Sequence, residues 1–176
     1  MDKFVIEGER KLSGSVTIQT SKNAVLPILA ASLLPEKGET IIHRLPNLAD
    51  VDTLLKVLER LGAKVKIYSD RSHFLPSQRT VVIRAEQMKS YEAPYDLVRK
   101  MRASFLVMGP LLARTGKAKV SLPGGCVLGP RPVNLHLSGF ARLGVKIKEE
   151  YGYVIASTDR LTGNTIFFDR PSHTGT

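Results

Sequence analysis

The chain has 176 residues and a formal net charge of +10, from 26 Lys and Arg against 16 Asp and Glu. Hydrophobic residues make up 43% and charged residues 24%, a globular composition that excludes an intrinsically disordered chain. The one cysteine excludes an internal disulfide framework.

The charge distribution and the length of the apolar segments indicate which kinds of molecule the chain binds. The basic residues are dispersed and the chain has no Trp, so we expect no nucleic-acid partner. The longest apolar stretch, residues 24–35, is shorter than the roughly 20 residues that cross a bilayer. We therefore expect no membrane partner and a cytoplasmic location. Small anions are the remaining class of ligand that a basic chain favours.

Hydrophobic periodicity predicts alternating helices and strands in the first half of the chain. The helix expected over residues 24–34 is apolar on nearly all faces, so we expect it to be covered all round. Gly62 follows an amphipathic helix and suits the left-handed conformation of a helix C-terminus. The series is a strand at 16–18, a helix at 24–34, a strand at 40–42, a helix at 51–61, and strands near 63–65 and 81–83.

The same series then occurs a second time. Residues 33–46 match residues 111–123 at an offset of 77 or 78, and residues 51–65 match residues 133–147 at an offset of 82. The match predicts a strand at residues 118–120 and places Gly144, like Gly62, at a helix C-terminus that suits the left-handed conformation. The repeat ends with a strand near residues 153–155. Repeated units of this kind predict an α/β (α+β) fold in which apolar helices are buried and sheets lie outside them.

The increase in offset marks an insertion in the second unit. It places five additional residues within the Gly- and Pro-rich segment 124–132. A third unit begins at residues 161–167, which resemble residues 12–18. Because fewer than three such units rarely bury their apolar faces, we expect an N-terminal piece of a longer protein. The alternative is an intact domain of two units.

Cys126 lies in that insertion, among glycines and prolines. A loop with few side chains to bury the thiol, and with Arg131 nearby, favours a reactive thiolate. The alternative is a small buried hydrophobe, as lone cysteines often are. The four histidines are isolated in sequence: His43, His73, His136 and His173. Their isolation argues against a metal site, and we expect no cofactor.

Two cations stand where helices are expected to begin. Lys22 and Asn23 precede the apolar helix of the first unit, and Arg102 occupies the matching place in the second. A cation at a helix N-terminus opposes the helix dipole unless an anion is bound between them. The pattern therefore indicates an anion site, with two ordinary surface charges as the alternative.

Several segments together resemble one enzyme family. They are Ser21-Lys22-Asn23-Ala24, Ala93-Pro94-Tyr95-Asp96-Leu97-Val98, Met101-Arg102-Ala103-Ser104, Ser121-Leu122-Pro123-Gly124-Gly125-Cys126 and Gly129-Pro130-Arg131-Pro132-Val133-Asn134-Leu135-His136. On these residues the chain resembles the UDP-N-acetylglucosamine enolpyruvyl transferases along its whole length, but covers less than half of a family member. The Gly-Gly-Cys segment distinguishes it from the sister family that makes enolpyruvyl-shikimate phosphate.

The resemblance implies a fold and a division into domains. Members have two domains, each an inside-out α/β barrel of three βαβαββ units about a pseudo-threefold axis. Residues 1–21 would then belong to the other domain, which the C-terminal half completes. Residues 22–176 would form an incomplete domain that carries the catalytic loop.

The resemblance also implies a reaction. The enolpyruvyl group of phosphoenolpyruvate moves to the 3′-hydroxyl of UDP-N-acetylglucosamine by addition and elimination, which releases phosphate and begins peptidoglycan synthesis. Cys126 would be the proton donor and the residue alkylated by fosfomycin, and Lys22 and Arg131 would share in catalysis. Contacts to the substrates would come from Lys22, Asn23, Arg102, Arg131, Pro132, Val133, Asn134, Leu135, Ser172, His173 and Thr174.

Two positions depart from the family pattern. Asn134 stands where many members have Asp, and residues 172–174 form a bulkier diphosphate-binding stretch than is usual. Because the family's general-base aspartate lies in the C-terminal half, we expect this chain alone to be inactive and to need that half as a partner. The alternatives are a basic binding module on the same fold and the related shikimate-pathway transferase.

Overall fold

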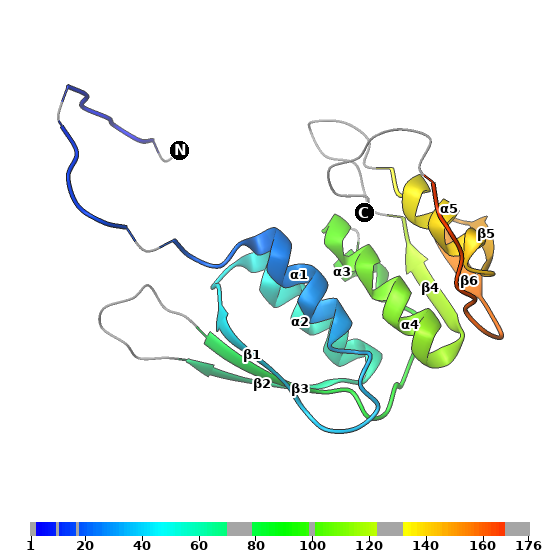
Figure 1. Cartoon of the computed structure of the whole chain (residues 1–176). Helices are drawn as coiled ribbons and strands as arrows, with labels where there is room; N and C mark the ends of the chain where they lie inside the picture. Colours follow the sequence, from blue (N-terminus) through cyan, green and yellow to red (C-terminus); the bar gives the residue numbers. More distant parts are fainter. Residues whose placement is uncertain are drawn as a thin grey trace.

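Two successive units of helices and strands make up the body of the chain in a computed structural model (Figure 1). The structure describes residues 3–9, 11–16, 18–69, 79–98, 101–122 and 132–167.

The first unit comprises α1 (Lys22–Ala31), β1 (Thr40–Leu45), α2 (Ala49–Leu61), β2 (Lys64–Ser69) and β3 (Arg79–Arg84). Its strands form an antiparallel sheet in the order β1-β3-β2. The second unit comprises α3 (Tyr95–Val98), the 3₁₀ helix η1 (Arg102–Val107), α4 (Met108–Thr115), β4 (Lys117–Ser121), α5 (Asn134–Arg142), β5 (Lys146–Glu150) and β6 (Tyr153–Ser157). Its sheet is antiparallel in the order β4-β6-β5, so the last strand is central in both units.

This order confirms the predicted repeat and the α/β (α+β) class. The predicted strands at 40–42, 81–83, 118–120 and 153–155 all lie within observed strands. Helix α2 ends at Leu61 and helix α5 ends at Arg142, each just before the glycine that was expected to terminate it. Both glycines, Gly62 (φ 117°) and Gly144 (φ 88°), adopt the left-handed conformation. The local sequence therefore sets where these helices end.

One hydrophobic core runs through both units. It joins the inner face of each sheet to the helices. Helix α1 packs against η1 and against α2, beside which it lies in Figure 1. Its fully buried members include Leu29, Leu54, Leu58, Ile83, Met108, Leu111, Val120 and Val154. Burial of apolar surface on this scale is the main force that holds the two units together.

A single arginine adds a polar link between the units. The guanidinium of Arg114 on α4 donates hydrogen bonds to the carbonyl oxygens of Leu33 (2.6 Å), Pro35 (2.9 Å), Ala85 (3.0 Å) and Glu86 (3.3 Å). All four acceptors belong to the first unit. The Arg114 side chain is only 9% exposed, so these carbonyls are its main compensation for leaving water.

Two expectations about the first unit were wrong. The helix expected over residues 24–34 ends at Ala31, so Leu34 lies beyond it and is 45% exposed. The helix is also not covered all round: it packs through one face on α2 and η1, and Ile28 is 51% exposed. Residues 16 and 18 form no strand, and Val16 and Ile18 are 85% and 86% exposed. In the described part of the chain no strand lies beside them, and the segment before α1 extends away from the body (Figure 1).

Candidate functional site

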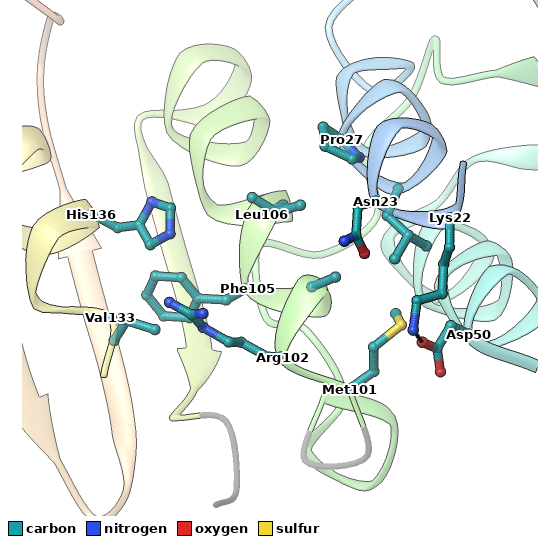
Figure 2. A pocket seen from close by; sticks show the side chains of 12 residues that line it. Lys22, Asn23, Pro27, Asp50, Met101, Arg102, Phe105, Leu106, Val133 and His136 are labelled. Atoms are coloured by element: carbon teal, nitrogen blue, oxygen red, sulfur yellow. Dashed lines mark hydrogen bonds and ion pairs between the residues drawn. The ribbon is translucent and has the colours of Figure 1, made fainter. Parts of the chain in front are cut away.

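The starts of several helices surround one cavity of about 610 Å³ (Figure 2). Lys22 is the first residue of α1, Asp50 the second residue of α2, and Arg102 the first residue of η1. The cavity is lined by Lys22, Asn23, Leu26, Pro27, Asp50, Met101, Arg102, Ala103, Phe105, Leu106, Val133 and His136. Polar groups from two units therefore face one space that has an apolar floor.

The helix starts make this space attractive to anions. Helices α1, α2 and α5 all begin at the cavity, and none has a side-chain hydrogen bond at its N-cap residue. Ser21 occupies the N-cap position of α1, but its hydroxyl does not cap the helix. Among the described residues, no N-cap side chain therefore occupies the first backbone N–H groups of these helices, which carry a partial positive charge.

Lys22 and Asp50 form an ion pair in the lining of the cavity. The Lys22 Nζ atom lies 2.8 Å from Asp50 Oδ2, and the two side chains are 47% and 37% exposed. The acid sits in the first turn of α2, where a helix dipole stabilises negative charge. In the structure the Lys22 ammonium thus points toward the start of α2.

Arg102 lies on the opposite side of the cavity, beside α5 (Figure 2). Its Nη2 donates a hydrogen bond to the carbonyl oxygen of Pro132 at 2.9 Å. That bond holds the segment that leads into α5 against η1. A planar guanidinium at this position suits a phosphate or a carboxylate.

His136 lines the cavity together with Arg102, close enough for the charge of Arg102 to act on its imidazole. Burial lowers the pKa of its imidazole below the usual 6.5, and the positive charge of Arg102 lowers it further. The ring lies 6.0 Å from the ring of Phe105, centroid to centroid. At neutral pH the imidazole is therefore uncharged and can both donate and accept a hydrogen bond.

Four residues that the sequence singled out lie together in the cavity lining: Lys22, Asn23, Arg102 and Val133. Pro132 is tied to Arg102 through its carbonyl, and Asn134 and Leu135 begin α5 without lining the cavity. The remaining predicted residues, Cys126, Arg131, Ser172, His173 and Thr174, lie outside the described residues.

Among the lining residues that the sequence did not single out, two carry ionisable side chains, Asp50 and His136. Asp50 is 28 residues from Lys22, and no local spacing connects them. His136 was noted as an isolated histidine and as the last residue of a family-like segment, without a role of its own. The signal available for Asp50 was its place at the start of a predicted helix, which does not distinguish a site residue from a capping residue.

The described residues contain neither a metal cluster nor a membrane helix. Among the described residues, no three His, Cys, Asp or Glu side chains gather where they could hold a metal ion. In the same part of the chain, no helix has the length and apolar character needed to cross a membrane.

Comparison with known proteins identifies the family. The family model described as EPSP synthase (3-phosphoshikimate 1-carboxyvinyltransferase) matches residues 6–176. The chain belongs to this family. A curated relative from Carboxydothermus hydrogenoformans, named UDP-N-acetylglucosamine 1-carboxyvinyltransferase 2, is 52% identical over 98% of this chain and 39% of its own length. The UDP-N-acetylglucosamine 1-carboxyvinyltransferase of Idiomarina loihiensis is 52% identical over 100% of this chain and 40% of its own length.

The solved structures agree on the fold of this family member. The enolpyruvyl transferase NikO from Streptomyces tendae superposes with a TM-score of 0.66 at 23% identity, over 88% of this chain and 32% of that one. An EPSP synthase from Acinetobacter baumannii superposes with a TM-score of 0.55 at 12% identity, over 80% of this chain and 32% of that one. The chain thus has the enolpyruvyl transferase fold and spans about 40% of the length of its curated relatives.

Proposed function

We propose that this chain forms part of a cytoplasmic UDP-N-acetylglucosamine 1-carboxyvinyltransferase of peptidoglycan synthesis. The observation that carries the proposal is the cavity in which Lys22, Asn23 and Arg102 meet beside three helix N-termini. Both proposed substrates, phosphoenolpyruvate and UDP-N-acetylglucosamine, bear phosphate groups. The names of relatives at about half identity support this choice of substrates.

In the proposed reaction the sugar 3′-oxygen bonds to C2 of phosphoenolpyruvate while a proton adds to C3. The tetrahedral adduct then loses a proton from C3 and expels phosphate, which restores the double bond. Lys22 and Arg102 would hold the phosphate and carboxylate, because charge-assisted donors stabilise the charge that develops on the leaving group. Asn23 would contact the nucleotide sugar, and uncharged His136 adds a donor and an acceptor at the side of α5.

Other parts of the proposal concern residues outside the described ranges or outside this chain. Cys126 would donate the proton to C3 and react with fosfomycin, Arg131 would bind the phosphate, and residues 172–174 would contact the diphosphate. Residues 1–21 would belong to the second domain, which accords with the high exposure of apolar Phe4 (98%) and Ile6 (88%). The remainder of a full-length relative would supply the general base.

Ligand titration followed by NMR tests the substrates. UDP-N-acetylglucosamine and phosphoenolpyruvate should bind saturably, and Lys22→Met and Arg102→Met should each weaken phosphoenolpyruvate binding about tenfold or more. Lys56→Met, on the exposed side of α2, is the matched control and should leave affinity unchanged. Binding of shikimate 3-phosphate in place of the sugar nucleotide would refute the assignment and favour the sister activity.

Activity and thiol chemistry supply separate tests. Phosphate release by the purified chain should be absent, and steady turnover would contradict the need for a C-terminal portion. Fosfomycin should label the chain, and Cys126→Ser should abolish labelling. Labelling that survives this substitution would remove Cys126 from its proposed role and favour the alternative of a non-catalytic binding module.

A further inference from the structure

Asp50 is the acidic residue in the lining of the cavity, and it is placed to act on Lys22. The two come from different helices, with Lys22 opening α1 and Asp50 in the first turn of α2 (Figure 2). Helix α1 packs on α2, and this packing brings Lys22 Nζ within 2.8 Å of Asp50 Oδ2. A carboxylate in an anion site opposes the ligand's charge, so its presence there calls for a physical reason.

The reason lies in the lysine side chain. An ammonium on four methylenes samples many rotamers and is repelled by the positive end of its own helix. Asp50 is stabilised by the N-terminus of α2 and offers a fixed acceptor. One of the three ammonium donors is then directed to Asp50, and two remain for a ligand.

We propose that Asp50 is a positioning residue, which holds the Lys22 ammonium where it meets the phosphate or carboxylate of the bound ligand. This inference deepens the proposed function and rests on it. The competing effect is repulsion between Asp50 and the ligand, which predicts the opposite sign: loss of the carboxylate would then tighten anion binding. The proposal holds that ordering of Lys22 outweighs this repulsion, which solvent weakens at a half-exposed carboxylate.

A double-mutant cycle separates these effects, with phosphoenolpyruvate as the probe. Asp50→Asn should weaken binding about fivefold when Lys22 is present, the size expected for one exposed ion pair. In a Lys22→Met background the same substitution should produce no weakening. Glu39→Gln is the matched control, because Glu39 forms an ion pair with Arg84 at 2.6 Å and is equally exposed (38%) but does not line the cavity.

The position of Lys22 can also be followed without ligand, by NMR relaxation of its side-chain carbons. Asp50→Asn should increase the mobility of the Lys22 side chain, and Glu39→Gln should not. Tighter binding after Asp50→Asn, equal weakening in both backgrounds, or unchanged Lys22 mobility would each overturn the inference. Absence of phosphoenolpyruvate binding by the unsubstituted chain would instead count against the proposed function, while the mobility measurement still decides whether Asp50 orders the lysine.

Discussion

Replacement of Arg114 by Met tests how the two units are held together. The substitution keeps an apolar stem of similar length and removes the guanidinium that spans four carbonyl oxygens of the first unit. Leu33 and Ala85 are buried, so their carbonyls lose a partner that water cannot easily replace. Pro35 and Glu86 are exposed, and water can hydrate their carbonyls after the change.

The expected cost follows from that difference. Each buried carbonyl left without a partner costs about 1–3 kcal/mol, whereas hydrated carbonyls cost little. Relief from burying a guanidinium that is 9% exposed offsets part of the loss. We therefore expect Arg114→Met to lower the free energy of unfolding by about 3 kcal/mol.

Urea unfolding followed by circular dichroism measures this difference. Arg84→Met is the matched control, since the Arg84 side chain is 56% exposed and forms an ion pair with Glu39 on the surface. Such a pair contributes about 0–1 kcal/mol. If Arg114→Met costs no more than Arg84→Met, the reasoning about buried carbonyls is wrong.

Three further predictions concern packing and titration. Gly62→Ala should destabilise by about 2 kcal/mol or more, because its Cβ would lie 2.6 Å from a backbone oxygen at φ 117°, while Gly38→Ala (φ 86°, open surroundings) should cost about 1 kcal/mol in thermal unfolding. Leu58→Ala should cost about 2–5 kcal/mol and half-exposed Leu34→Ala much less; equal costs would contradict the assignment of the core. The pKa of His136 is lowered in the folded chain, so the unfolded chain binds more protons below the ordinary value of 6.5. The free energy of unfolding should therefore decrease as pH falls through 6.5, and His136→Gln should reduce this slope; an unchanged slope would assign it to other groups.

The sequence determined the repeat and most of the secondary structure because both depend on neighbours a few residues apart. Helix periodicity and the glycines that end helices are local properties, and Gly62 and Gly144 adopt the expected left-handed conformation. The match between the units likewise predicted that Lys22 and Arg102 occupy equivalent helix starts. The family resemblance came from motifs that are contiguous in the chain.

The tertiary structure alone decided which of these residues meet. Lys22 and Asp50 are 28 residues apart, and Arg114 is 81 residues from the Leu33 carbonyl that it binds. Residues this far apart in sequence come together because α1 packs against α2 and η1, and no local sequence pattern predicts that packing. Packing also decided which face of α1 is buried. A helix that is apolar on nearly all faces does not show from its sequence which face turns to the core, and Ile28 proved to be 51% exposed.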